Sequence, residues 1–307
     1  MTQNIPLAVL LTVLASVALA VASVVQHSAV GDTAGPNAGA KLSGARLLTV
    51  IRNPRWLGGL LITGVGAGLQ IVALLLAPVT VVQPIGVLAV PWTILLAARV
   101  HRRAITPAMW GAAALTVVGT AAFAWVAITY AAPYPVLNDG WLVTGTLVGF
   151  GIAGLFALAG ARGPEPLRCL AWAAAAAVVY GAESGVVKAI GHYVASRPWL
   201  GSPVFWLLAG SILLGMVLAG MWIQQAYASG PAEIVVGTLN AAGPVAGVLF
   251  GIAVLGEGVN LSWGPALLML AFAAVAIAGV VLLSRLHPGV QAGVVADGAA
   301  AGRPGQS

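Results

Sequence analysis

The stretch APVTVVQPIGVLAVP, Ala77–Pro91, has a counterpart later in the chain, GPAEIVVGTLNAAGP, Gly230–Pro244. In each copy the same interval separates two prolines, and a Trp-Gly pair follows after one further common interval. All matches share one offset of 153 residues, the distance from Pro78 to Pro231. The other matches are Pro91 with Pro244, Val82 with Val235, Leu96 with Leu249, and Trp110-Gly111 with Trp263-Gly264. These spacings predict an internal repeat of two helices and a loop, and chance similarity between Ala-, Gly- and Val-rich helices is the alternative.

The composition around the repeat indicates a membrane protein. Of the 307 residues, 60% are hydrophobic and only 7% are charged, whereas a soluble domain carries about 25% charged residues. Nine runs are apolar over at least the roughly 20 residues that a bilayer crossing needs, and they do not alternate as barrel strands do. The runs are Ile5–Val30, Trp56–Ala77, Val79–Ala98, Pro107–Ala131, Gly140–Ala161, Pro166–Tyr193, Pro203–Ala228, Pro231–Leu255 and Ser262–Leu283. The expected fold is therefore an all-α polytopic membrane protein with about nine transmembrane helices.

The basic residues predict how the chain is oriented. The formal net charge is +6, but the bases form no basic face, so no nucleic-acid partner is expected. They gather in every second loop, after the first, third, fifth and ninth predicted helices, while the opposite side keeps only Arg197. Because basic loops stay in the cytoplasm, this predicts a multi-pass plasma-membrane protein with its N-terminus outside and its C-terminus in the cytoplasm.

The repeat pairs the third predicted helix with the eighth and the fourth with the ninth. A shift of five helices is odd, so the two copies are expected to cross the membrane in opposite directions. Many secondary transporters use such inverted repeats to build two open states around a site at mid-membrane. The predicted organisation is residues 1–139 as the first repeat, 140–286 as the fifth helix and the second repeat, and 287–307 as a disordered cytoplasmic tail.

Two segments leave alternatives open. The first helix is expected to be retained because Met1–Pro6 carries no Lys or Arg, but the small residues at Ala18–Ala20 also fit a cleaved signal peptide. Lys41–Arg52 mixes bases with leucines, which fits an interfacial helix on the cytoplasmic leaflet as well as a solvated loop.

Several segments resemble the drug/metabolite transporter superfamily, and most closely its EamA- and NIPA-like branches. Trp56–Val90, WLGGLLITGVGAGLQIVALLLAPVTVVQPIGVLAV, looks like the second and third helices of that superfamily, and Arg162–Gly191 resembles its sixth. Gln224–Pro244 is similar to its Gln- and Pro-containing region, and Leu249–Glu257, LFGIAVLGE, to the ending of EamA-type repeats. The resemblance covers most of Trp56–Leu283, although ten-helix members have one helix more. It implies transport of metabolites, amino acids or drugs, or of magnesium in NIPA-like proteins.

Polar side chains inside the predicted helices are the candidate substrate-binding residues, because such groups are costly in lipid and usually functional. Glu183 is expected to be a substrate or proton site, with a buried structural carboxyl as the alternative. Lys188 lies near the outer boundary, where snorkelling is equally expected, and Glu233 also fits a helix-capping role. The full predicted set is Glu183, Lys188, Glu233, Gln70, Gln83, Gln224 and Asn240.

Prolines and glycines within the helices predict where the helices flex and where they pack closely. Pro84, Pro91 and Pro244 remove backbone hydrogen bonds in mid-helix, so they are predicted hinges. Three glycine pairs spaced four residues apart are expected to allow close packing within the monomer, with a homodimer as the alternative. They are Gly64/Gly68, Gly145/Gly149 and Gly247/Gly251.

The motif inventory narrows the function. No G-x-x-x-x-G-K-[ST] is present, so the expected function is secondary transport of a small organic solute or metabolite by alternating access, without ATP hydrolysis. A NIPA-like magnesium or divalent-cation transporter is the alternative, and a non-transporting accessory subunit is a further one. An enzyme is not expected, because H-E-x-x-H and G-x-S-x-G are absent.

Cys169 is the single cysteine of the sequence, so no disulfide forms within the chain. No cofactor is expected. A metal site is left undetermined, and the expected partners are the solute or cation and the lipid bilayer.

Overall fold

The structure is a computed structural model. It describes residues 3–34, 52–100, 104–130, 138–196, 198–230, 232–258 and 260–286. The predicted tail, nearly all of the predicted interfacial segment and the side chain of Glu233 lie outside these residues. The described part is helical and contains no strand. Its helices are α1 (Ile5–Ala34), α3 (Pro54–Leu76), α4 (Val79–Gly86), α5 (Ala89–Val100), α6 (Pro107–Tyr130), α7 (Asp139–Arg162), α8 (Glu165–Ser196), η2 (Trp199–Gly201), α9 (Pro203–Ser229), α10 (Ala232–Ala253) and α11 (Trp263–Arg285).

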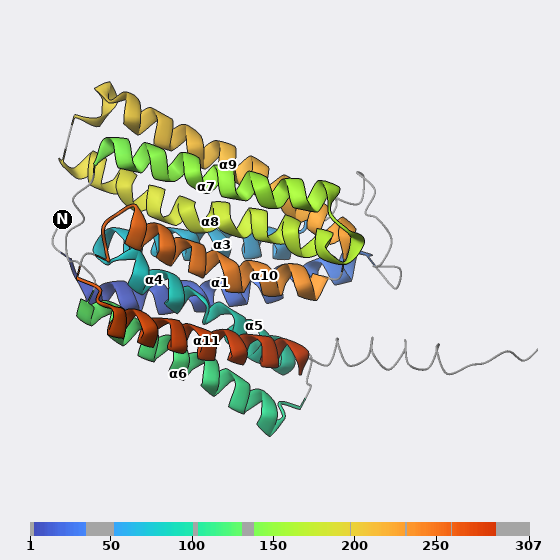
Figure 1. Cartoon of the computed structure of the whole chain (residues 1–307). Helices are drawn as coiled ribbons and strands as arrows, with labels where there is room; N and C mark the ends of the chain where they lie inside the picture. Colours follow the sequence, from blue (N-terminus) through green and yellow to red (C-terminus); the bar gives the residue numbers. More distant parts are fainter. Residues whose placement is uncertain are drawn as a thin grey trace, which may run out of the picture.

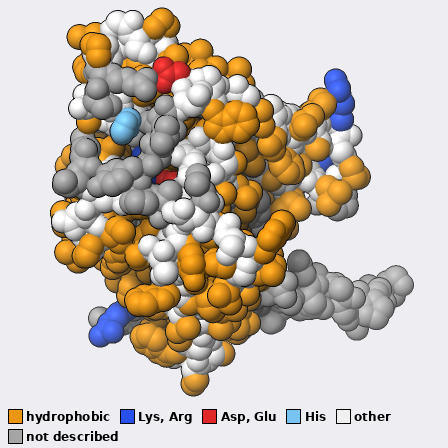
Figure 2. All heavy atoms as spheres, turned by 60° about the vertical axis from the view of Figure 1, so that its left-hand side comes forward, with side chains coloured by type: hydrophobic (Ala, Val, Ile, Leu, Met, Phe, Trp, Pro, Cys, Tyr) orange, Lys and Arg blue, Asp and Glu red, His pale blue; other side chains and the backbone are white. Residues whose placement is uncertain are grey.

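The described residues contain nine spans that are long and apolar enough to cross a membrane, each of 20 to 29 residues. Their outward faces are apolar as well, and Leu61, Leu155 and Leu213 are each more than two thirds exposed. Figure 2 shows hydrophobic side chains over much of the visible surface, with few charged groups among them. A surface of this kind is stable in lipid and prone to associate in water. The predicted fold class, a multi-pass helical membrane protein, is confirmed.

The third span is broken, although the sequence analysis expected one continuous helix there. A two-residue turn, Val87–Leu88, separates α4 from α5. Pro91 has no N–H for the carbonyl of Val87, four residues earlier, and its ring would crowd that carbonyl. The carbonyl of Val87 instead accepts the N–H of Val90 at 3.0 Å, a tighter three-residue hydrogen bond. Pro244, by contrast, lies within a continuous α10, so the two copies of the repeat differ at this point.

Successive spans alternate in direction (Figure 1). In that view α4 and α5 run from left to right, and α10 runs from right to left. The start of α1 lies beside the end of α3, since the Asn4 N–H donates to the carbonyl of Leu76 at 3.0 Å. The start of α7 lies beside the end of α10, since the Trp141 Nε1–H donates to the carbonyl of Ala253 at 2.7 Å. We call this end of the bundle the N-terminal face. In a bundle whose successive spans alternate, any two spans an odd number apart run in opposite directions, so the inverted repeat stays a prediction.

Glycines allow α6 and α11, the second helices of the two predicted copies, to lie in backbone contact. A Cβ on Gly119 would lie 2.6 Å from the backbone nitrogen of Ala276, and one on Gly279 would lie 2.6 Å from the backbone nitrogen of Thr116. Real Cβ atoms do not approach a backbone nitrogen this closely, so these two positions need glycine.

The three predicted glycine pairs divide into two groups. Gly145, Gly247 and Gly251 face neighbouring side chains at distances that leave little or no room for a Cβ, as expected for packing within the monomer. A Cβ on Gly64 or Gly68 would meet nothing within 4 Å, so this part of α3 stays open on the monomer surface.

Candidate functional site

A cavity of about 420 Å³ lies between α4, α6, α10 and α11. Small-molecule sites in proteins are typically about 300–1,000 Å³, so the volume suits a small solute. Two of the three predicted hinge prolines, Pro84 and Pro244, line it, and so does Asn240 from the predicted substrate-binding set. Most of the remaining lining is aliphatic or aromatic, and Thr120 supplies the second polar side chain.

The cavity is lined by residues from both predicted copies of the repeat. Three pairs of its lining residues are separated by the repeat offset of 153 residues, one partner coming from each copy. They are Val87 with Asn240, Thr120 with Ala273, and Phe123 with Ala276. In the first two pairs one partner is polar and the other is apolar, so the polar groups of the cavity are the places where the two copies differ in sequence.

The prolines also alter the backbone around this cavity. Pro244 has no N–H to offer the carbonyl of Asn240, just as Pro91 has none for the carbonyl of Val87. Asn240 and Val87 both line the cavity. The carbonyl of Val87 accepts the N–H of Val90 instead. Both prolines therefore alter the backbone hydrogen bonding at the cavity wall, where irregular backbone is tolerated in a membrane protein.

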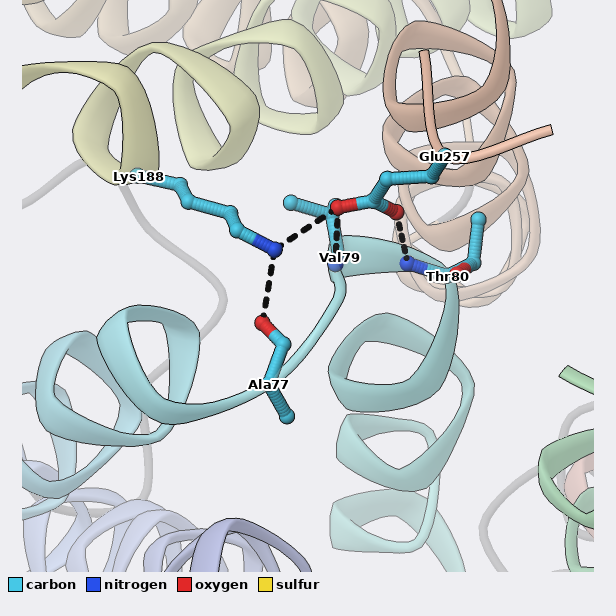
Figure 3. Close-up of polar contacts among 5 residues, drawn as sticks. All are labelled: Ala77, Val79, Thr80, Lys188 and Glu257. Atoms are coloured by element: carbon cyan, nitrogen blue, oxygen red, sulfur yellow. Dashed lines mark hydrogen bonds and ion pairs between the residues drawn. The ribbon is translucent and has the colours of Figure 1, made fainter. Parts of the chain in front are cut away.

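A buried ion pair ties together four elements at the N-terminal face (Figure 3). The Lys188 ammonium on α8 lies 2.8 Å from Oε1 of Glu257, in the loop between α10 and α11, and it also donates to the carbonyl of Ala77 at 2.9 Å. The backbone N–H of Val79 donates to Oε1 of Glu257 at 2.7 Å, and that of Thr80 donates to Oε2 at 2.9 Å. Lys188 is 8% exposed and Glu257 1%. We call this group the Lys188–Glu257 clamp.

The local sequence explains why Glu257 caps α4. The helix begins after Pro78, which has no side-chain cap to offer, so the first N–H groups of α4 need another acceptor. The carboxylate satisfies two of them and also interacts favourably with the positive end of the helix dipole. Gly256 turns the loop with a positive φ of 71°. Gly251 leaves room for the carboxylate, because a Cβ there would lie 2.6 Å from Oε2 of Glu257.

Glu183 lies in mid-α8 and belongs neither to the cavity lining nor to the clamp. It is 8% exposed, and its Oε1 has no hydrogen-bond partner among the described residues. Gly215 of α9 makes room for it, since a Cβ there would overlap Oε1. A carboxyl without a partner in lipid is far more stable in its neutral form.

The remaining predicted residues are scattered. Gln70 approaches Gly86 at the end of α4, and Gln83 packs against Gly247 of α10. Gln224 is exposed on α9. Among the members of the predicted substrate-binding set whose side chains the structure describes, only Asn240 lines the cavity.

No family model, no curated protein and no solved structure matches this chain. The resemblance to drug/metabolite transporters therefore stays an expectation drawn from the quoted motifs. Within the described residues, no group of three or more His, Cys, Asp or Glu side chains is placed to hold a metal ion.

The sequence analysis missed Glu257 and Thr120 as functional candidates. Glu257 lies beyond the predicted end of the eighth helix at Leu255, so it is not among the polar residues predicted inside the helices. The one feature of the sequence that points to Glu257 is that it is the last residue of the LFGIAVLGE segment, which resembles the ending of EamA-type repeats. Thr120 carries no distinguishing motif, and its interest comes from where α6 places it.

Proposed function

We propose that this protein is a secondary transporter that moves a small organic solute across the plasma membrane by alternating access. One observation carries the proposal: the cavity is lined by α4 and α6 on one side and by α10 and α11 on the other, which are the helices of the two predicted copies. A site shared by two oppositely directed copies can open to one side or the other by exchange of their conformations. The break at Val87–Leu88 gives the first copy a ready hinge, and the absence of a P-loop is consistent with transport not driven by nucleotide hydrolysis.

The Lys188–Glu257 clamp is the gate at one end of this pathway. Ile252 and Leu261, which both line the cavity, flank the loop that carries Glu257. Holding Glu257 against α4 and Lys188 therefore keeps this loop over the end of the cavity. Release of the clamp would free the start of α4 and the loop together. The basic loops predict that this end, the N-terminal face, is the outer one.

Two observations count against the divalent-cation alternative. Magnesium prefers oxygen ligands, usually including carboxylates, and no carboxylate lines the cavity. The buried carboxylate of Glu257 is already occupied by Lys188 and two backbone N–H groups. A cation site is therefore a poorer fit to the described residues than an organic solute.

The proposal is tested by counterflow in proteoliposomes, using a panel of neutral, anionic and cationic organic solutes and Mg²⁺. We expect one class of organic solute to accumulate transiently. Filling the cavity with Ala273→Trp should abolish that accumulation, while Ala274→Trp, on the exposed side of the same helix, should preserve it. Counterflow of Mg²⁺ alone, or equal activity of the two tryptophan variants, would reject the proposal.

A further inference from the structure

We infer that Glu183 is a proton-binding site, and that its proton couples solute transport to the proton gradient across the membrane. The coupling rests on the proposed transport function, whereas proton binding can be measured without transport. The inference adds a coupling ion to the transport cycle and assigns it to a side chain outside both the cavity and the clamp.

The carboxyl of Glu183 is sealed between α8 and α9. The residue is 8% exposed, and its Oε1 has neither a hydrogen-bond partner nor a counter-charge among the described residues. Val179, one turn earlier on α8, and Ala219, one turn after Gly215 on α9, belong to a buried apolar cluster beside it. An ionised carboxylate is strongly disfavoured in such surroundings, so in this conformation the carboxyl holds a proton.

The other titratable groups near Glu183 do not neutralise it. On α8, Tyr180 lies one turn earlier and is a phenol, which carries no charge at neutral pH. Lys188, five residues later, is bound to Glu257. In the helices that pack against α8, the titratable residues all lie within one turn of a helix end, far from mid-α8; they are Arg55, Asp139, Arg162, Tyr227 and Glu233. A proton is therefore the charge that neutralises Glu183.

Glu183 is linked to the cavity through the contact between α8 and α10. Gly181, two residues before Glu183, faces the backbone of α10, since a Cβ there would lie 2.6 Å from the backbone nitrogen of Gly247. Gly247 itself lies between Val245 and Val248, which both line the cavity. Because closely packed helices transmit displacements to one another, a rearrangement of α10 that opens the cavity also moves α8 at Glu183.

These contacts define the part of the proton in the transport cycle. In the conformation described here the Lys188–Glu257 clamp is closed and Glu183 is sealed. Movement of α8 relative to α9 would admit water, and the carboxylic acid would then transfer its proton to water and become a carboxylate. The ionised side chain cannot return to its apolar surroundings until it binds another proton. A proton taken up on one side of the membrane and released on the other therefore accompanies each cycle.

Infrared spectroscopy of the full-length protein tests proton binding directly. Bilayers of ether lipids are suitable, because they contain no ester carbonyl that would mask the signal. The wild type should show the carbonyl stretch of a protonated carboxylic acid at neutral pH, and Glu183→Gln should lose that band. Glutamine is uncharged and close in shape to protonated glutamate, so this variant should fold. Asp139→Asn, at the start of α7, is the matched control and should keep the band. Absence of the band from the wild type, or its persistence in Glu183→Gln, would overturn the inference.

Gly215→Ala tests the position of the carboxyl without altering it chemically. The added Cβ would overlap Oε1 of Glu183, so the acid band should shift or disappear. Gly210→Ala, on the same helix, places a Cβ with nothing within 4 Å and should leave the band unchanged. An unchanged band in Gly215→Ala would show that the protonated carboxyl is not the one held between α8 and α9, and would also overturn the inference.

Solute accumulation under a pH gradient tests the coupling. The solute that shows counterflow is placed at equal concentration on both sides of the proteoliposome membrane, and a pH gradient is imposed in each orientation. The wild type should accumulate the solute under one orientation, Glu183→Gln should lose that accumulation, and Asp139→Asn should keep it. A wild type that ignores the gradient, or accumulation retained by Glu183→Gln, would refute the coupling. The acid band without any counterflow would refute transport and leave the proton site standing.

Discussion

The Lys188–Glu257 clamp makes a quantitative prediction, because the two charges have different surroundings once separated. Lys188→Met leaves the carboxylate of Glu257 with two backbone N–H groups and the N-terminus of α4. Glu257→Gln leaves the ammonium of Lys188 with the carbonyl of Ala77 and no counter-charge. Removing one partner of a buried pair costs about 3–5 kcal/mol. We expect Glu257→Gln to reach that range, and Lys188→Met to cost about 1–2 kcal/mol less, since the helix end still stabilises the carboxylate.

The double variant separates the ion pair from the other contacts. With both charges removed, no unpaired charge remains, so Lys188→Met/Glu257→Gln should be no less stable than Glu257→Gln alone. The coupling free energy, the difference between the summed single effects and the double effect, should therefore be at least the cost of Lys188→Met, about 1 kcal/mol or more. Equilibrium unfolding in mixed detergent micelles measures all four proteins of the cycle.

The control for this cycle is Arg99→Met, which removes an exposed base from the last turn of α5 and should cost less than about 1 kcal/mol. Additive single effects, with a coupling near zero, would refute the reasoning, because independent residues do not form a clamp. Equal losses in the two single variants would refute the assigned role of the α4 N-terminus.

Two further predictions concern helix packing and the break in the third span. Gly119→Ala should lower the free energy of unfolding by about 1–3 kcal/mol, because the added Cβ would overlap the backbone of α11. Gly111→Ala is the control on the same helix: its Cβ would meet nothing within 4 Å, so the change should be neutral or slightly stabilising. A thermal melt of each variant checks both expectations. Pro91→Ala restores an N–H for the carbonyl of Val87, so α4 and α5 should join, the melting temperature should rise and counterflow should slow. The control Pro107→Ala, at the start of α6, should change neither the melting temperature nor the counterflow rate. Faster counterflow by Pro91→Ala would contradict a hinge at this position.

The overall fold could be predicted from the sequence because lipid imposes a simple rule. A membrane span must be apolar over roughly 20 consecutive residues. The nine runs predicted on this basis correspond to the nine candidate spans among the described residues. The irregular backbone in the third span could be anticipated too, because a missing N–H is a local property of proline. The break at Val87–Leu88 follows from Pro91, although the sequence analysis expected a single helix with a hinge in it.

The clamp could not be predicted from the sequence, because it depends on tertiary distance. Lys188 and Glu257 are far apart in the chain, and Glu257 belongs to a short loop after the predicted helix end. Its position depends on Gly251 and on the N-terminus of α4, which is far from it in the sequence. For the same reason Thr120 looked like any other helical threonine until α10 and α11 were placed opposite it.

The central claim is that two oppositely directed helix pairs enclose a cavity that opens to each side of the membrane in turn. Thiol labelling of Ala273→Cys, in a Cys169→Ala background, tests this most directly when a membrane-impermeant reagent is added to either side of proteoliposomes of known orientation. The cavity proposed here should give modification from both sides, with an excess of transported solute shifting the balance between them. Modification from one side alone, whatever the solute gradient, would contradict alternating access through this cavity.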